Sequence, residues 1–281
     1  MAVKLVADTG CDLPDDLLTR YDIRQVPLIL RFGEQEVADS SATRAQLWQR
    51  IEQGLPCATS GPPAGDYMAA FAPLVADGHQ VLCLTLTGAH SVTYTGAALA
   101  AQSFPGQVMV VDSRSISLGY GLQVLEAAEM LARGADLPSA QAAVLAMQHR
   151  LNLRFFLEAL DQVKRGGRLD GLMPLLNRLG SALNLRALLT LNAEGRITLV
   201  GPARGRRGAA RRIADDLRVL GPVERIAVAH SRAADEAHAL ADELAAALHF
   251  PRHEVLMVEI GSVLLAHAGA GLLGAGIVSR Q

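Results

Sequence analysis

The run VLCLTL, residues 81–86, and the run VMVVD, residues 108–112, decide the fold. Short apolar runs that end in turn residues are typical of buried parallel strands. A helical pattern over residues 91–102 lies between the two runs, and the run VKLVA, residues 3–7, opens the same alternation. Repeated strand–helix units predict a doubly wound α/β domain with a parallel sheet, whose binding crevice lies at the carboxyl ends of its strands.

Beyond residue 150 the pattern of the sequence changes. The segment NAEG, residues 192–195, separates two apolar runs in the way that is typical of a β-hairpin. We therefore predict two domains, an α/β domain over residues 1–150 and an α+β domain with a mixed or antiparallel sheet over residues 151–281. The expected helices and strands of the second domain are strands 153–157, 185–191, 196–200, 226–229 and 254–260 and helices 208–220 and 233–248.

Composition narrows the classes of function. Half of the 281 residues are hydrophobic, 19% are charged and the net charge is -2, so the chain is expected to fold and not to bind nucleic acid or membrane surfaces through charge. Its three cysteines show no CxxC spacing, which argues against a disulfide framework or a zinc site and indicates a cytoplasmic protein.

One long apolar segment, residues 255–278, has the length of a membrane span. It carries Glu259 and His267 and several glycines, and buried charge and backbone entropy argue against a helix within a bilayer. We expect a buried strand, a glycine-rich turn and a last strand instead. The apolar run at residues 3–7 is too short for a signal peptide.

Three short stretches place a hydrogen-bonding side chain inside an apolar turn marked by glycine or proline. They are ATSGPP at residues 58–63, HSVTY at residues 90–94 and LAHAGAG at residues 265–271. Such a set can hold a small anionic head group while the apolar residues around it take up a hydrophobic tail. The set offers hydroxyls and an imidazole but no nucleophile–base pair and no metal cluster, so it favours a binding protein without a catalytic site, a metal or a cofactor.

Two apparent motifs point elsewhere. Asp8-Thr9-Gly10 matches the aspartic-protease triplet, but that chemistry needs two such loops, and a turn after the first strand is the better interpretation. GAGLLG, residues 269–274, matches GxGxxG, yet the sequence after Gly274 is too short for the strand–helix unit of a dinucleotide site. Close packing or a turn that faces a ligand remain open for it.

A basic run at residues 204–212 holds five arginines at a predicted strand-to-helix junction. It is either a solvated start of a helix or a patch that docks an anion or a partner, because guanidinium groups recognise carboxylates and phosphates. The run has no interleaved aromatic residues and lies on a net acidic chain, which disfavours nucleic acid.

Taken together and in order, these motifs resemble the DegV family of bacterial fatty-acid-binding proteins. DTGCDLP at residues 8–14 is similar to the opening turn of the family, and TS at residues 59–60 and SVTY at residues 91–94 are similar to its two hydroxyl loops. The basic segments RGGRL at residues 165–169 and RGRR at residues 204–207 match two more motifs, and residues 261–271 match the segment that carries the histidine of the family.

The resemblance implies a fatty acid enclosed in a tunnel between two domains. It places the carboxylate on Thr59 or Ser60, on Ser91 and on His267. It also implies a partner, an ATP-dependent fatty acid kinase that phosphorylates the carboxylate for phospholipid synthesis. The arginines that lie near the acyl head and the kinase surface would be Arg168, Arg204 and Arg207.

The sequence departs from the family motifs at three frame positions. Gly61 stands where the family has glutamine, Val92 where it has glycine and Ala270 where it has proline. Each loop keeps its hydrogen-bonding side chain but has a different neighbouring residue. The geometry of the bound head group can therefore differ from that of the family. Two alternatives stay open: a lipid-responsive module that docks on another partner, and an acyl hydrolase or transferase that uses Ser91 or Ser60 with His267.

Overall fold

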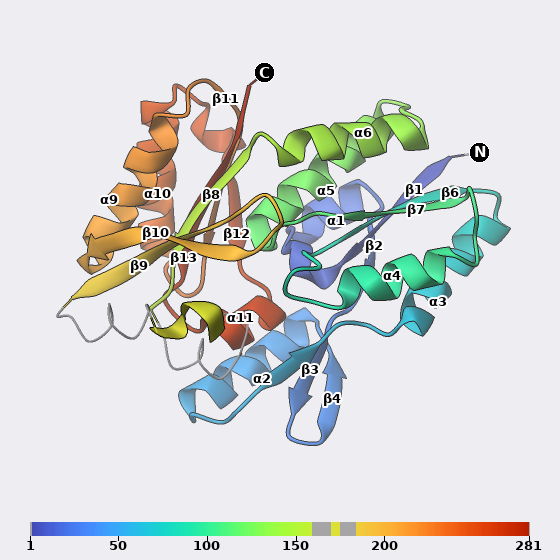
Figure 1. Ribbon diagram of the computed structural model, residues 1–281, viewed down its shortest axis with the longest axis horizontal. Helices are drawn as coiled ribbons and strands as arrows, with labels where there is room; N and C mark the ends of the chain where they lie inside the picture. Colours follow the sequence, from blue (N-terminus) through green and yellow to red (C-terminus); the bar gives the residue numbers. More distant parts are fainter. Residues whose placement is uncertain (1, 159–169, 175–183, 281) are drawn as a thin grey trace. The chain divides into compact units, whose positions relative to one another are not determined.

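The computed structural model describes residues 2–158, 170–174 and 184–280. These residues form two compact units (Figure 1). Unit 1 comprises Met1–His149 with the short segments Ala193–Gly195 and Gly261–Val263, and unit 2 comprises Arg150–Asn192, Arg196–Ile260 and Leu264–Gln281.

Unit 1 is built on a parallel four-stranded sheet in the order β2-β1-β6-β7. Its central strands β1 (Val3–Asp8) and β6 (Gln80–Thr85) are buried along most of their length, as the apolar runs predict. β2 (Arg24–Val26) and β7 (Val108–Asp112) lie at the two edges. Because all four strands run the same way, their carboxyl ends meet at one edge of the sheet, where turn residues leave for the helices.

Helices cover both faces of this parallel sheet, which is therefore doubly wound (Figure 1). α3 (Ala64–Ala76) and α4 (Thr93–Ala101) pack together on one face, and α5 (Ser117–Ala132) and α6 (Leu137–Gln148) pack together on the other. Local sequence sets where α6 begins, because the Asp136 carboxylate accepts a hydrogen bond from the Ser139 amide at 2.9 Å. The remaining helical elements near the start of the chain are η1 (Thr9–Cys11) and α1 (Asp15–Arg20).

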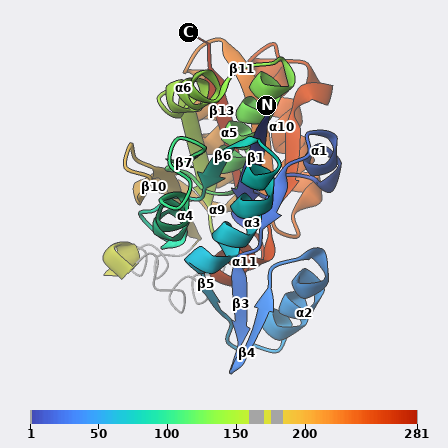
Figure 2. The ribbon, with the colours of Figure 1, turned by 90° about the vertical axis from the view of Figure 1, so that its right-hand side faces the viewer.

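A small antiparallel sheet, which the sequence analysis did not predict, belongs to the same unit. Its strands β3 (Ile29–Phe32), β4 (Gln35–Ala38) and β5 (Ala58–Ser60) pair in the order β4-β3-β5. Figure 2 shows α2 (Ser41–Glu52) beside these strands, and the Arg50 guanidinium lies over the Phe32 ring at 4.9 Å. A capping box between Ser40 and Thr43 starts α2.

Unit 2 contains a mixed six-stranded sheet in the order β10-β9-β8-β13-β11-β12. Strand β13 (Leu273–Ser279) lies in the middle and pairs antiparallel with β8 (Leu151–Phe156) on one side and β11 (Val223–His230) on the other. β9 (Leu185–Leu191) and β10 (Ile197–Arg204) form the predicted hairpin, and β12 (Leu256–Glu259) pairs parallel with β11. The fold class is confirmed: a parallel sheet is followed by a mixed sheet.

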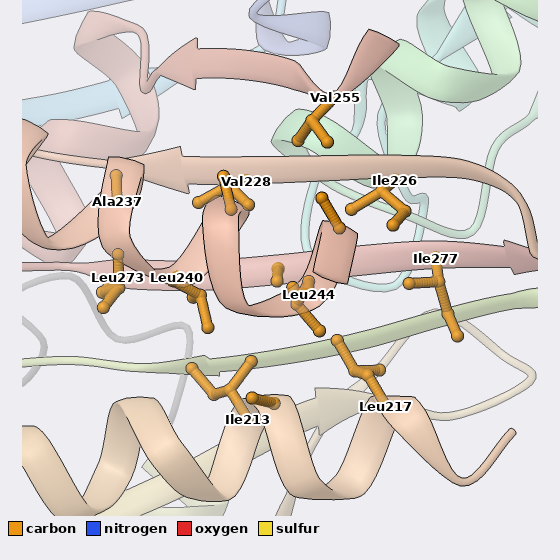
Figure 3. Close-up of a cluster of buried hydrophobic side chains, with 14 of the residues drawn as sticks. Ile213, Leu217, Ile226, Val228, Ala237, Leu240, Leu244, Val255, Leu273 and Ile277 are labelled. Carbon is orange, nitrogen blue, oxygen red and sulfur yellow. The ribbon is translucent and has the colours of Figure 1, made fainter. Parts of the chain in front are cut away.

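The core of unit 2 is a largely aliphatic cluster, which also contains Phe156, between this sheet and two helices (Figure 3). α9 (Gly205–Arg218) contributes Ile213 and Leu217, and α10 (Ala234–Ala247) contributes Leu240 and Leu244. The strands contribute side chains such as Ile277, which is fully buried. Two short 3-10 helices, η2 (Asp170–Leu172) and η3 (Arg252–Glu254), complete the described elements apart from α11.

The expectation for the end of the chain is confirmed for its two strands and wrong for the segment between them. We expected a strand, a glycine-rich turn and a last strand over residues 255–278, but a helix, α11 (Ser262–Ala268), lies between β12 and β13. His267 is therefore on a helix, and the turn begins only at Gly269. Seven residues are too few for helical periodicity to stand out from the surrounding apolar sequence.

Candidate functional site

The first hydroxyl loop is positioned by the small antiparallel sheet. Thr59 and Ser60 are the last residues of β5, where they pair with Leu30 and Ile29 of β3, and both side chains are half-buried. The chain then passes through Gly61-Pro62-Pro63 into α3, whose first residue is Ala64. Prolines cannot continue the ladder, so the strand ends at Ser60 and presents its hydroxyls at the sheet edge.

The second hydroxyl loop follows β6 and leads into α4. Its half-buried Ser91 has its Oγ 2.5 Å from the Oγ1 of Thr93, the first residue of α4, and it accepts the Thr93 amide N–H at 3.3 Å. Thr93 itself is fully buried. The pair of hydrogen bonds fixes the Ser91 hydroxyl against the start of the helix, at a carboxyl end of the parallel sheet.

The two hydroxyl loops touch at Gly61. A Cβ atom at this position would lie 2.9 Å from the Thr93 Oγ1 and 3.2 Å from both the Thr93 amide nitrogen and the Val92 Cγ2. Real Cβ atoms do not approach that closely, so glycine is required for this contact. The structure therefore brings the loop of Thr59 and Ser60 together with the turn of Ser91.

The same contact involves two positions at which we expect a departure from the motifs that the sequence resembles. The structure places Gly61 and Val92 side by side. The Val92 side chain is 67% exposed, so it adds an apolar surface beside Ser91.

His267 belongs to unit 2 and is half-buried in the last turn of α11. The helix ends at Ala268, and the next residue, Gly269, has a left-handed φ of 68° and donates its amide N–H to the Leu265 carbonyl at 2.8 Å. A glycine in this conformation is a common helix terminator because a Cβ would be strained there. The GxGxxG match therefore begins at the C-terminal cap of a helix, so no dinucleotide fingerprint is formed.

Two of the three arginines proposed for docking lie within the described ranges. Arg204 is the last residue of β10 and Arg207 is in the first turn of α9, and both side chains are exposed. Neither takes part in an ion pair within the described ranges, whereas Arg206 between them is paired with Glu236. Arg168 lies outside the described residues.

The burial of two carboxyl groups near the first strand was not predicted. Asp8 ends β1 and is fully buried, accepting the backbone N–H of Leu86 at 2.8 Å and of Gly10 at 2.9 Å. Burial raises the pKa of Asp8 to about 7, although the two amides and the Tyr120 hydroxyl oppose the shift. Asp8 therefore caps η1 and ties β1 to the segment after β6. The apolar run that precedes it was the available signal.

A second acid, Asp12, holds the start of α5. The Ser117 hydroxyl donates to its carboxylate at 2.5 Å, and both residues have a left-handed backbone, with φ of 52° and 45°. Burial raises the pKa of Asp12, and the nearby carboxylate of Asp39 adds to the shift. Within the described ranges, His, Cys, Asp and Glu side chains form no group of three that could hold a metal ion. These carboxyl groups therefore act here as hydrogen-bond acceptors for turns.

Among the residues that the structure describes, no helix is both long enough and apolar enough to cross a bilayer.

The fold and the loops define an α/β protein made of a doubly wound parallel unit and a mixed-sheet unit. A family model described as "Uncharacterised protein, DegV family" matches residues 2–280, and the chain therefore belongs to the DegV family. A DegV domain-containing protein from Deinococcus radiodurans is 32% identical over 280 residues, covering 98% of this chain and 97% of that protein. One from Mycobacterium bovis is 33% identical over 286 residues, covering 98% and 96%.

Solved structures also match along nearly the whole chain. A DegV-family protein from Thermus thermophilus, described for its fatty acid binding, is 34% identical with a TM-score of 0.90, and each chain is covered to 100%. A stearic-acid-binding protein from Eubacterium ventriosum is 23% identical with a TM-score of 0.84, covering 99% of this chain and 98% of that one. The second similarity concerns the fold alone, whereas the first relates this chain to a fatty-acid-binding member of its family.

Proposed function

We propose that this protein binds a long-chain fatty acid in a tunnel between an N-terminal domain, residues 1–150, and a C-terminal domain, residues 151–281. Its carboxylate is held by Thr59 or Ser60, by Ser91 and by His267. The observation that carries the proposal is the contact at Gly61, which brings the loop that holds Thr59 and Ser60 against the turn that holds Ser91. The 34% identical fatty-acid-binding protein from Thermus thermophilus supports the ligand class.

The chemistry of these donors suits a fatty acid. Burial of each methylene contributes about 0.8 kcal/mol, so a long acyl chain supplies on the order of 10 kcal/mol before the costs of association. A carboxylate that leaves water must keep its hydrogen bonds, and hydroxyl groups and an imidazole N–H can provide them. Neutral donors hold the head group without the strong ion pair that a lysine would form.

We further propose that the bound carboxylate is presented to a separate fatty acid kinase in the bacterial cytoplasm. An oxygen of the carboxylate would attack the γ-phosphoryl group of ATP on the kinase, giving acyl phosphate and ADP, for phospholipid synthesis. The protein itself would be a carrier without a catalytic site or a cofactor. Arg204, Arg207 and Arg168 would dock the kinase, and the exposed, unpaired state of Arg204 and Arg207 among the described residues supports this role.

The ligand is tested directly by mass spectrometry. Recombinant protein, purified without added lipid and then denatured, is expected to release about one fatty acid per chain. Delipidated protein is expected to bind palmitate or oleate in a titration. An empty protein that also ignores both acids would disprove the proposed function.

The site is tested with alanine variants of Ser91 and His267 and with a matched serine variant as the control. Ser91→Ala and His267→Ala are each expected to weaken palmitate binding about 3- to 10-fold, because each removes one hydrogen bond to the head group. Ser103→Ala removes an exposed hydroxyl in the same unit and serves as the control. Unchanged affinity in both site variants would remove these residues from the site.

The docking role is tested with a bacterial fatty acid kinase. Arg204→Ala is expected to bind palmitate normally and to support acyl-phosphate formation more slowly than the wild type. Arg212→Ala is the control, since Arg212 lies on the same helix but is paired with Asp216 at 2.5 Å. Wild-type phosphorylation with Arg204→Ala and Arg207→Ala would remove the docking assignment.

A further inference from the structure

Ser231 stands directly after β11 and fastens the turn that follows His267. Its Oγ donates to the Gly269 carbonyl at 2.7 Å and accepts the Leu272 amide N–H at 2.9 Å. Its backbone makes two more hydrogen bonds, accepting from Gly271 at 2.9 Å and donating to Leu272 at 3.1 Å. The side chain is fully buried, so none of these bonds competes with water.

Arg206 fastens the same turn from another element. Its Nη1 donates to the Gly271 carbonyl at 2.6 Å. The guanidinium is itself held in place, by Glu236 with Nε–Oε distances of 2.6 and 2.7 Å, and by Glu158 with an Nη1–Oε2 distance of 3.4 Å. It also lies over the ring of Phe156, with its central carbon 5.3 Å from the ring centre. Ser231 and Arg206 thus bind the carbonyls at the two ends of the turn.

The turn is packed so closely that its conformation is fixed. Gly271 has a left-handed φ of 84°, and a Cβ there would lie 2.8 Å from the Glu158 Cβ and 3.1 Å from the Arg206 Nη1. Gly269, directly after α11, has a φ of 68°. A helix of seven residues has little stability of its own, so its placement depends on how its ends are held. His267 lies two residues before Gly269, whose carbonyl accepts the Ser231 hydroxyl.

We propose that Ser231 and Arg206 are positioning residues for His267, which hold the C-terminal end of α11 so that the imidazole faces the carboxylate of the ligand. This role rests on the proposed fatty-acid-binding function. Ser231 and Arg206 do not contact the ligand themselves. Arg206 thereby differs from its neighbours Arg204 and Arg207, whose exposed side chains are proposed to dock the kinase.

Head-group selectivity tests the role in binding. Palmitate and hexadecanol share a tail of the same length, but only palmitate carries the carboxylate. Ser231→Ala and Arg206→Met are expected to weaken palmitate binding about 3- to 10-fold and to leave hexadecanol binding within about twofold. Arg206→Met keeps an apolar stem over Phe156, and Arg212→Ala is the control on α9. An equal loss for both ligands would mean general loosening of the unit and would overturn the proposal.

A double-mutant cycle and a ligand-free measurement complete the test. Ser231→Ala combined with His267→Ala is expected to bind palmitate no more weakly than His267→Ala alone, whereas additive losses would contradict positioning. The imidazole signals of His267, assigned by NMR in ligand-free protein, are expected to shift in Ser231→Ala and Arg206→Met and not in Arg212→Ala. Unchanged signals would overturn the proposal. If the wild type binds no fatty acid, the proposed function fails. The imidazole signals then still show whether Ser231 and Arg206 position His267.

Discussion

The two units differ in how they treat polar groups in their interiors. In the described ranges, every buried polar or charged side chain except Ser231 belongs to unit 1. Those of unit 1 are Asp8, Asp39, Thr43, Thr85, Thr87, Thr93, Ser113, Ser115, Ser117, Gln123, Glu126 and Ser262. Unit 1 therefore fixes its loops through a network of buried hydrogen bonds, whereas unit 2 combines an aliphatic core with one buried serine.

The topology of the two sheets accounts for this difference. Asp8, Thr85 and Ser113 lie at or just after the carboxyl ends of β1, β6 and β7, which the parallel sheet gathers at one edge. Strand ends of a mostly antiparallel sheet are distributed over two edges and are joined by shorter turns. At this edge the Asp8 carboxylate accepts the Leu86 amide N–H and the Gln123 side-chain amide donates to the Ser113 carbonyl, so buried polar groups hold the loops of unit 1. In unit 2, Ser231 and Arg206 hold the turn that follows α11.

The largest effect is expected from the aliphatic core of unit 2. Ile213 is fully buried, so Ile213→Ala should lower the free energy of unfolding by about 2–5 kcal/mol through lost burial and a cavity. Hydrogen exchange should show a greater loss of amide protection in β8, β11 and β13 than in the strands of unit 1. Val219→Ala, at a position 74% exposed, is the control. An equal loss of protection in unit 1 would show that the two cores do not unfold independently.

A smaller effect is expected where the hydroxyl loops of unit 1 meet. Gly61→Ala places a Cβ against Thr93 and should cost about 1–3 kcal/mol, because the Thr93 hydroxyl must turn away from Ser91. Palmitate affinity should fall with it. Gly65→Ala, in α3, is the matched control, since nothing lies within 4 Å of a Cβ there. If Gly61→Ala were as harmless as Gly65→Ala, the loop contact would not define the site.

Two buried tyrosines test whether the polar network of unit 1 stabilises it. The Tyr120 hydroxyl donates to the Leu84 carbonyl at 2.7 Å and accepts the Asp8 amide at 3.0 Å, so Tyr120→Phe should cost about 1–3 kcal/mol. The equally buried Tyr67 hydroxyl has no hydrogen-bond partner among the described residues. Tyr67→Phe should therefore leave the unfolding free energy unchanged or raise it. Chemical denaturation of both variants checks the contrast, and equal losses would contradict it.

The mildest test is the pH dependence of stability. Between pH 3.8, the ordinary pKa of an aspartate, and about 7, its pKa in the folded state, Asp8 keeps its proton when folded and loses it when unfolded. The free energy of unfolding should therefore fall as pH rises through this range, by up to about 1.4 kcal/mol per pH unit from this group. Asp8→Asn should flatten the slope measured by urea denaturation, and Asp22→Asn, an exposed site, should not. A slope unchanged in Asp8→Asn would contradict the raised pKa.

Regular repeated elements could be predicted from the sequence. The apolar runs at residues 3–7, 81–86 and 108–112 became β1, β6 and β7, because buried parallel strands leave a continuous apolar signal. Strands β3, β4 and β5 were missed, since three or four residues carry too little pattern. α11 was missed for the same reason.

The candidate site was predictable only as separate loops. Thr59, Ser60, Ser91 and His267 follow from local turn signals and the family resemblance, but the contact at Gly61 depends on residues about 30 positions apart in the sequence. The buried carboxyl of Asp8 is hydrogen-bonded to Leu86, 78 residues away, and the Ser231 hydroxyl is hydrogen-bonded to Leu272, 41 residues away. Contacts of that range leave no mark on a single sequence.

The central place of β13 in the unit 2 sheet has a consequence for synthesis on the ribosome. All its partner strands precede it, so β8 and β11 emerge with their facing edges open until residues 273–279 have been made. The parallel sheet of unit 1 needs nothing beyond Asp112. From the end of β8 at Phe156 to the start of β13 at Leu273, the nascent chain therefore carries an unpaired strand edge, which is a site of aggregation until β13 covers it.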